Sequence, residues 1–257
     1  MRKLKNIVIK LLNLTQKDIN IKNPWSGKKF FLNSFTHKSY WFYNKKREKE
    51  TMEFFQNQIE TNFTIVEVGG HIGWMTQFFS ILANKGSVFV FEPGSKNIKY
   101  LIRNISDCEN ITHESFAVSN FIGKSKFYEE DLTGQNNSLK GNYTVFDENA
   151  KAQGVKAVRR EVEVDVVTLD NYFKDVPVDF IKIDVEGAEL EVLQGGLQTL
   201  KYVKVIVLEV SVQPIEVFAL LRNQGFIMYD TNNNLLDSLP FDYFGNIFAF
   251  NKSPLKA

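Results

Sequence analysis

The segment 179–196, DFIKIDVEGAELEVLQGG, constrains the fold of this chain most strongly. Its first part reads as a short buried strand, Phe180–Ile183, and its second part as a helix. Asp184 and Glu186 stand between the two, at the expected carboxyl end of the strand. Ligands of open α/β sheets bind at that edge. The segment therefore predicts such a sheet, with two carboxylates at its ligand-binding edge.

Strand-like and helix-like segments alternate from Glu53 onward, which is typical of an α/β fold with a mostly parallel sheet. We expect strands at 64–68, 87–91, 111–118, 180–183 and 203–209, and helices at 76–82, 96–105 and 215–223. Two short strands near the end, at 226–230 and 246–251, suit an antiparallel hairpin at one edge of the sheet.

Length and cysteine content narrow the class of protein. A chain of 257 residues with 44% hydrophobic residues can bury one sizeable core. Cys108 is the only cysteine, which excludes an intrachain disulfide and favours a reducing compartment. The basic start MRKLKNIVIKLLNL lacks a small-residue cleavage site, and no apolar run is long enough to span a bilayer. We therefore expect a cytoplasmic protein.

The N-terminal fifth differs in charge from the rest of the chain. Residues 1–50 hold 13 Lys or Arg against 3 Asp or Glu, a balance of +10, whereas the remaining 18 bases and 27 acids give −9. Aromatic residues are interspersed among these lysines: Trp25, Phe30, Phe31, Phe35, Tyr40, Trp41, Phe42 and Tyr43. We expect residues 1–52 to form an extension or cap on a catalytic domain at 53–257. The extension could bind an anionic or ring-shaped partner, or its aromatics could pack on the main domain.

A glycine-rich turn follows the first strand of the expected sheet. Glycines stand at 69, 70 and 73, within the sequence EVGGHIG. The dinucleotide fingerprint G-x-G-x-x-G, begun at Gly69, would need glycines where His71 and Trp74 stand. Because that fingerprint lets a pyrophosphate approach a helix N-terminus, the departure favours a nucleotide without phosphates.

S-adenosyl-L-methionine is such a nucleotide, and the residue types fit it. Glu67 suits its cationic amino acid end, while Gly69 and Gly70 permit close approach of the backbone. Glu92 ends the next strand, 23 residues after Gly69, where an acid that accepts from the ribose diol is expected. His71 could be a base or an acceptor contact, or only a local hydrogen-bond partner.

Four motifs occur in an order that is specific to one family: TIVEVGGHIGWMT, SVFVFEPGSKNIKYL, VEVDVVTLDNYF and DFIKIDVEGAELEVLQGG, followed by VIVLEVS. This succession resembles the FkbM family of S-adenosylmethionine-dependent methyltransferases over about residues 64–215. The resemblance implies a Rossmann-like class I methyltransferase fold with a seven-stranded sheet. It also implies O-methylation of hydroxyl groups, commonly on sugars or secondary metabolites.

The resemblance also implies roles for individual residues. Glu67, Gly69, Gly73 and Glu92 fall on cofactor positions, while Asp184 and Glu186 face the reaction centre. One departure stands out, because the chain has Gly-Gly-His-Ile-Gly where such proteins often read G-A-N-I-G. The role of the asparagine position is therefore open for His71.

An alcohol is a poor nucleophile at neutral pH, so a carboxylate that accepts its proton should accelerate methyl transfer. Asp184 is the first choice for this base, and Glu186 and Glu209 could orient acceptor hydroxyls. Alternatively, Asp184 caps the following helix and Glu186 interacts with its dipole. We predict no metal, because Asp184 and Glu209 are the only clear ligands, although Mg²⁺ assistance stays open.

The insertion 121–167 is the least informative part of the sequence. EVEVDVV alternates acids with valines, as in a strand with one solvent-exposed and one buried face. The polar loop GQNNSLKGN could close over the cofactor or contact the acceptor, and its candidate contacts are Asn136, Asn137 and Ser138.

Three functions remain in competition. The first is O-methylation of a carbohydrate or related hydroxylated small molecule, which depends on the four motifs. The second is RNA methylation through the basic N-terminal region. It is disfavoured because IDVE stands where many base-methylating enzymes have an N-P-P-Y type sequence. The third is a non-catalytic cofactor-binding module, against which the retained acids argue. The oligomeric state and the role of residues 1–50 are not indicated by the sequence.

Overall fold

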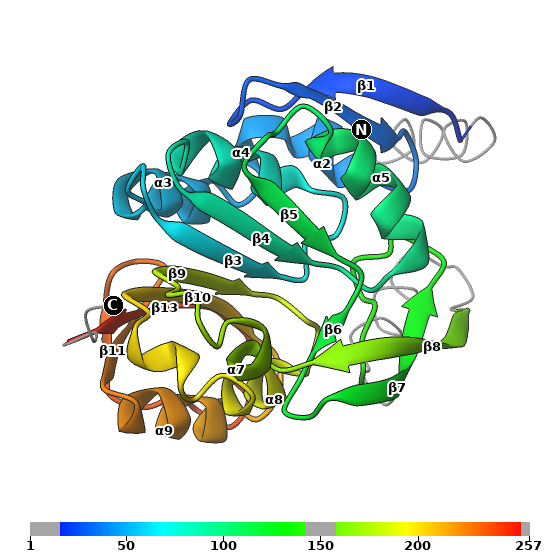
Figure 1. The fold of residues 1–257 in the computed structure, drawn as a ribbon. Coiled ribbons are helices and arrows are strands. Elements are labelled where there is room, and N and C mark those ends of the chain that lie inside the picture. Colours follow the sequence, from blue (N-terminus) through cyan, green and yellow to red (C-terminus); the bar gives the residue numbers. More distant parts are fainter. Residues whose placement is uncertain (1–15, 142–157, 253–257) are drawn as a thin grey trace.

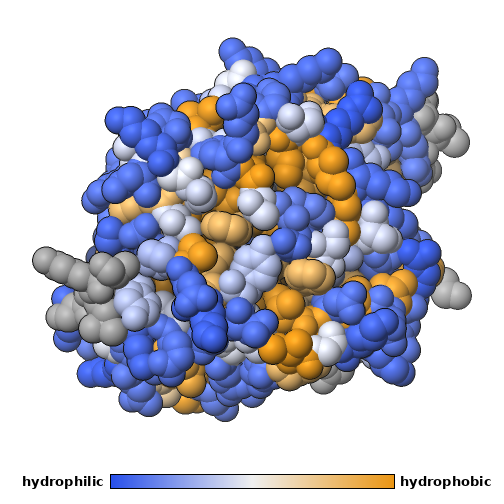
Figure 2. Space-filling model, viewed as in Figure 1, coloured by the Kyte–Doolittle hydropathy of each residue, from blue (hydrophilic) through white to orange (hydrophobic). Residues whose placement is uncertain are grey.

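A computed structural model describes residues 16–141 and 158–252 (Figure 1). The first 15 residues of the expected extension and residues 142–157 of the expected insertion therefore lie outside the described parts. Within these parts, no helix is both long and apolar enough to cross a bilayer. The face seen in Figure 2 is largely hydrophilic, with hydrophobic side chains gathered towards its middle.

A large mixed sheet with the strand order β12-β11-β13-β10-β9-β3-β4-β5 forms the centre of the fold. Its strands are β3 (Thr64–Val68), β4 (Ser87–Phe91), β5 (Ile111–Glu114), β9 (Phe180–Ile183), β10 (Val205–Val210), β11 (Phe226–Asp230), β12 (Leu235–Leu236) and β13 (Gly245–Asn251). The pairs from β10 to β5 are parallel, and β13 runs antiparallel between β10 and β11. The Rossmann-like α/β prediction is confirmed, including the antiparallel C-terminal pair.

Two details differ from the expectation. The sheet has eight strands rather than seven, because the two-residue β12 pairs with the outer edge of β11. The single strand expected at 111–118 is divided into β5 and β6 (Ala117–Val118), and β6 belongs to a different sheet. Strand β6 pairs with β8 (Arg159–Val167) in the insertion, so the chain leaves the main sheet between β5 and β6.

Helices cover both faces of the sheet, as expected for strands that are buried throughout. Among the described residues, the helices after the N-terminal segment are α4 (Trp74–Leu82), α5 (Ser95–Ile105), α7 (Leu169–Tyr172), α8 (Glu189–Gln194) and α9 (Pro214–Asn223), with the 3₁₀ turn η2 (Thr199–Lys201). One core, with Phe79, Phe180 and Phe248, lies between the sheet and α4. The other core joins the opposite face to α7, α8 and α9 (Figure 1).

The N-terminal segment packs on the α4 side of the molecule. Its described part consists of the hairpin β1 (Asp18–Lys22) and β2 (Lys29–Asn33), then α2 (Lys38–Tyr43), η1 (Asn44–Lys46) and α3 (Lys49–Gln58). Phe30, Tyr40 and Phe55 are buried in the same core as Phe79, whereas Phe42 and Tyr43 are exposed. Helix α3 runs across residue 52, where the sequence suggested that the extension ends.

The described part of the insertion forms an antiparallel ribbon of β7 (Gly123–Glu130) and β8, extended by β6 into a three-stranded sheet. The predicted alternating strand EVEVDVV is the larger part of β8. The ribbon extends beside the carboxyl end of the main sheet (Figure 1). It therefore brings residues 131–141 to that edge.

Candidate active site

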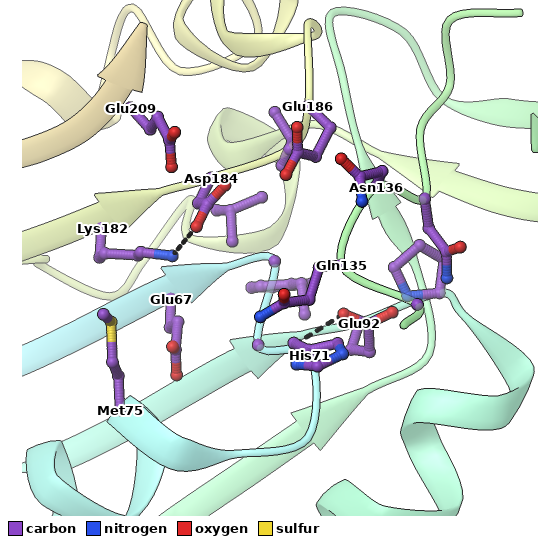
Figure 3. A pocket seen from close by; sticks show the side chains of 18 of the residues that line it. Glu67, His71, Met75, Glu92, Gln135, Asn136, Lys182, Asp184, Glu186 and Glu209 are labelled. Carbon is purple, nitrogen blue, oxygen red and sulfur yellow. Dashed lines mark hydrogen bonds and ion pairs between the residues drawn. The ribbon is translucent and has the colours of Figure 1, made fainter. Parts of the chain in front are cut away.

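A cavity of about 390 Å³ opens at the carboxyl edge of the main sheet, within the usual size range of small-molecule sites. Eight of the nine site residues predicted from the sequence line it: Glu67, Gly69, Gly70, His71, Glu92, Asp184, Glu186 and Glu209 (Figure 3). The ninth, Gly73, does not line it. Gly73 precedes α4 with φ of 86°, and a Cβ there would lie 2.8 Å from Leu101. The absent side chain therefore lets the start of α4 pack closely against α5.

The glycine turn is shaped by the neighbouring strands. Gly69 has φ of 89°, and a Cβ there would lie 1.8 Å from the carbonyl oxygen of Asp184. A Cβ on Gly70 would lie 2.2 Å from Val90. Both Gly69 and Gly70 donate backbone N–H groups to the carbonyl of Phe91. The turn is therefore held against β4 and β9, with its outer surface in the cavity.

Glu92 is buried at the end of β4 and accepts three hydrogen bonds from the protein. Its Oε2 accepts from the backbone N–H of His71 at 2.7 Å. Its Oε1 accepts from the backbone N–H of Gly94 at 2.8 Å and from the Asn97 amide at 3.2 Å. Burial raises the pKa of Glu92 to about 7, although these three donors oppose the shift. A carboxylate has about four acceptor positions, so one is left for a ligand.

His71 is held by both ring nitrogens. Its Nδ1 lies 2.8 Å from the Tyr40 hydroxyl, and its Nε2 lies 3.1 Å from the carbonyl of Thr133. A carbonyl can only accept, so Nε2 carries the proton and Nδ1 accepts from Tyr40. Burial lowers the pKa of His71 to about 3. The ring is neutral and has no free nitrogen for an acceptor proton, which leaves the local hydrogen-bonding role.

Lys182 lies in the middle of the carboxylates, and sequence reasoning missed it. Its Nζ donates to Asp184 Oδ2 at 2.8 Å, and in the sheet register it stands beside Glu67 (Figure 3). Burial would lower the pKa of Lys182, but the carboxylates of Asp184 and Glu67 outweigh it and raise the pKa. Burial also raises the pKa of Glu67, to about 7, and Thr76 donates to this carboxyl at 2.6 Å. The feature of the sequence that could have revealed Lys182 is the presence of a lysine within the otherwise apolar strand FIKI.

Glu209 is the penultimate residue of β10, lies next to Asp184 and accepts no hydrogen bond from the described parts of the chain. The nearby Asp184 carboxylate, together with burial, raises the pKa of Glu209 above its usual range. Two neighbouring carboxyl groups resist a second negative charge. At neutral pH this arrangement favours a Glu209 that retains a proton for part of the time, beside an Asp184 that is paired with Lys182.

The alternative in which Asp184 caps α8 does not match the geometry. The N-cap residue is Ala188, and no side chain caps the helix there. Glu189 holds the preceding turn instead, because its two oxygens accept from the backbone N–H of Gly187 and the hydroxyl of Ser211. Glu186 lies outside the helix with φ of 55° and lines the cavity. Both Asp184 and Glu186 are thus directed to the cavity.

The N-terminal segment also contributes to the cavity. Tyr40, Arg47 and Glu48 line it. The Arg47 guanidinium lies 4.4 Å from the centre of the Tyr40 ring and forms an ion pair with Glu48 at 2.9 Å. Nothing in the lysine-rich sequence around Arg47 distinguished it from its neighbours. The basic segment is therefore part of the wall of the site.

The insertion loop closes another side. Gln135, Asn136 and Asn137 line the cavity, while the hydroxyl of Ser138 donates to the carbonyl of Glu186 at 2.6 Å. Asn136 and Asn137 thus lie where the sequence placed possible ligand contacts, and Ser138 positions the Glu186 turn. Among residues 16–141 and 158–252, no group of three or more His, Cys, Asp or Glu side chains could hold a metal ion.

Comparisons with known proteins agree with this fold. A sequence model of the FkbM methyltransferase domain matches residues 67–228. A protein of Beauveria bassiana named Methyltransferase 1 is 30% identical over 150 residues, which are 51% of this chain and 57% of that protein, so the chain spans little over half of its relative.

Two solved structures are more distantly similar. One is a precorrin-6y C5,15-methyltransferase of Geobacter metallireducens, with 14% identity, coverage of 79% and 89%, and a TM-score of 0.44. The other is a fibrillarin of Aeropyrum pernix with natively bound S-adenosyl-L-methionine, with 12% identity, coverage of 90% and 82%, and a TM-score of 0.42.

Proposed function

Because this chain belongs to the FkbM methyltransferase family, we propose that it transfers the methyl group of S-adenosylmethionine to a hydroxyl group of a carbohydrate or related metabolite. One observation carries the proposal. Glu92, the acid expected to accept from the ribose diol, and the ion-paired carboxylate Asp184 line one cavity. We call the part around the glycine turn, His71 and Glu92 the cofactor half. The part around Asp184 and Glu209 is the acceptor half.

The cofactor half fits S-adenosylmethionine by the chemistry of its donor set. Glu92 has one acceptor position left for a ribose hydroxyl, and the backbone of Gly69 and Gly70 faces the cavity without side chains. Six acids line the cavity (Glu48, Glu67, Glu92, Asp184, Glu186 and Glu209) against the two bases Arg47 and Lys182. This excess of carboxylates suits a cationic sulfonium.

Asp184 acts as the general base of the proposed reaction. When bound, S-adenosylmethionine supplies an electrophilic methyl group. Asp184 accepts the proton of the acceptor hydroxyl through the carboxylate oxygen that Lys182 does not hold. Lys182 fixes the orientation of this carboxylate through the ion pair with its other oxygen. Orientation of the hydroxyl by the walls of the cavity supplies a further share of the acceleration.

The same excess of acids disfavours RNA as the acceptor. Phosphate contacts dominate protein affinity for RNA, and a lining with six acids against two bases does not attract a polyanion to the reacting centre, even with Glu67, Glu92 and Glu209 partly protonated. The two bases are also already paired, Lys182 with Asp184 and Arg47 with Glu48. A neutral hydroxylated acceptor is therefore preferred.

Transfer of radiolabelled methyl from S-adenosylmethionine into a fractionated cell extract tests the proposal. We expect label in the glycan or small-metabolite fraction with the wild type, and little label with Asp184→Asn. Asp237→Asn is the matched control, because Asp237 is exposed and does not line the cavity. Label that enters RNA, or that persists at the wild-type level with Asp184→Asn, would contradict the proposal.

A further inference from the structure

Glu209 and Asn246 stand opposite each other at the edge of the acceptor half. They are direct partners in the antiparallel register of β10 and β13. Directly opposed residues of antiparallel strands place their side chains on the same face, with Cβ atoms about 5 Å apart. Both residues line the cavity. The register therefore presents a carboxyl group and a carboxamide side by side.

Neither of these side chains forms a hydrogen bond within the described parts of the protein. The Glu209 carboxyl accepts no hydrogen bond there, and the Asn246 amide makes none either; Tyr243 donates to the backbone carbonyl of Asn246 instead. Both residues are only partly exposed. A carboxyl and a carboxamide that face a cavity without protein partners in these parts are available to hydrogen-bond a ligand that enters it.

Phe244 completes this wall. It lines the cavity two residues before Asn246, and 55% of its surface is exposed. No described aromatic ring stacks on it, unlike the many buried rings of the core. An aromatic ring offers a flat apolar surface, which packs well against the C–H groups of a ring-shaped ligand.

From this arrangement we infer that Glu209, Asn246 and Phe244 form the acceptor subsite, and that it binds a sugar ring by two neighbouring hydroxyl groups. This inference depends on the proposed function, since it locates the acceptor of that reaction. The carboxyl of Glu209 accepts from one hydroxyl, the amide of Asn246 donates to and accepts from the other, and Phe244 covers the apolar face of the ring.

The subsite selects for a pair of hydroxyls rather than for a single alcohol. An acceptor that lacks one hydroxyl would leave Glu209 or Asn246 unpaired beside a bound ligand, which sites built on hydrogen bonds penalise strongly. An anionic group is disfavoured at the same place, because it would approach the carboxyls of Asp184 and Glu209. Neutral sugars with free adjacent hydroxyls are the matching chemical class.

Saturation-transfer NMR on the full protein with S-adenosylhomocysteine tests the subsite. The probes are methyl glycosides of glucose, galactose, mannose, fucose and rhamnose, together with the deoxy analogues of any glycoside that binds. We expect at least one glycoside to bind, and Asn246→Ala, Glu209→Gln and Phe244→Ala each to weaken its binding about tenfold or more. Loss of one adjacent hydroxyl from the probe should have an effect of similar size.

Two control variants match these substitutions. Phe241→Ala removes a phenylalanine that is 81% exposed, three residues away and not part of the cavity. Glu216→Gln alters an exposed acid in the first turn of α9. Both should leave glycoside binding unchanged.

The possible outcomes separate this inference from the proposed function. If none of the glycosides binds, or if binding survives Asn246→Ala and Phe244→Ala, the subsite is refuted. Methyl transfer to a different acceptor that still requires Asp184 would then leave the proposed function standing. Conversely, glycoside binding without any affinity for S-adenosylhomocysteine would refute the proposed function and retain the sugar subsite.

Discussion

The two halves of the cavity differ in how the protein uses their polar groups. In the cofactor half, Glu92 accepts three protein hydrogen bonds, and both nitrogens of His71 are engaged. In the acceptor half, the carboxyl of Glu209 and the amide of Asn246 form no hydrogen bonds with the described parts of the chain. Asp184 is held at one oxygen only.

This contrast indicates that the two halves differ in how they would bind their ligands. The cofactor half is organised in advance by its own hydrogen bonds, which lowers the cost of ordering it when a ligand binds. The acceptor half keeps groups without partners among the described residues, and an acceptor that pairs with them gains specificity. Substitutions in the two halves should therefore have separable effects, on cofactor affinity in one and on turnover or acceptor affinity in the other.

The largest expected effect is on turnover in the acceptor half. Asp184→Asn removes the proposed base with little change of shape, so kcat should fall about 100-fold or more. Affinity for S-adenosylhomocysteine should change by less than about threefold, because Glu92 and the glycine turn are unaltered. Initial rates and calorimetry on the same preparation measure both quantities. Equal losses in the two would show that the halves are not separable.

Lys182→Met should have the next largest effect. It removes the cation that orients Asp184 and that lowers the pKa of the neighbouring Glu209, so kcat at neutral pH should fall about tenfold. The acidic limb of the pH–rate profile should move to higher pH. A merely structural lysine would lower activity without moving that limb, so the full profile is the required measurement. Lys204→Met, at a partly exposed ion pair with Asp179 outside the cavity, is the control.

Glu189 supports the turn that carries Glu186, and it gives a pH-dependent stability. Burial raises the pKa of Glu189 to about 7, so the folded state binds its proton more tightly than the unfolded state does. This contribution is complete below an unfolded pKa near 4.5 and is lost as the pH rises to about 7.

The variant Glu189→Gln lacks that titration. The Tm of the wild type relative to Glu189→Gln should therefore fall between pH 5 and pH 8, by on the order of 5 °C. Thermal unfolding monitored by circular dichroism at both pH values gives this difference. A difference that is constant with pH would mean that Glu189 titrates alike in the folded and unfolded states.

Tyr40→Phe should have the smallest effect and should act on the cofactor half. The Tyr40 hydroxyl donates to His71 and accepts from Gln135, while the ring stays packed in the core. Its loss should weaken S-adenosylhomocysteine binding a few fold, with kcat at saturation nearly unchanged. A tenfold loss of kcat would instead place Tyr40 among the groups that act on the acceptor.

Most of the sheet and much of the site followed from local sequence patterns. Strands β3, β4 and β9 occur at the predicted residues, because each is a short apolar run followed by a turn. The carboxyl ends of parallel strands meet at one edge, which is why Glu67, Glu92 and Asp184 could be assigned to one site.

The missed residues come from long-range packing. Arg47 and Glu48 reach the cavity because the N-terminal segment folds over the α4 side, and Asn246 reaches it through its pairing with Glu209. No local pattern encodes either contact. His71 illustrates the converse, since its position was predicted, whereas its lack of a free nitrogen follows from Tyr40 and Thr133, which lie far away in the sequence.

Calorimetric binding of S-adenosylhomocysteine to the wild type, Glu92→Ala, Glu92→Gln and Asp184→Asn tests the division of the cavity most directly. Both Glu92 variants, with their folds checked by circular dichroism, should bind at least about 30-fold more weakly, since a buried carboxyl partner of the ligand is lost. Asp184→Asn should bind like the wild type. Unchanged binding by the Glu92 variants, or loss of binding by Asp184→Asn, would contradict the assignment of Glu92 to the cofactor half and of Asp184 to the acceptor half.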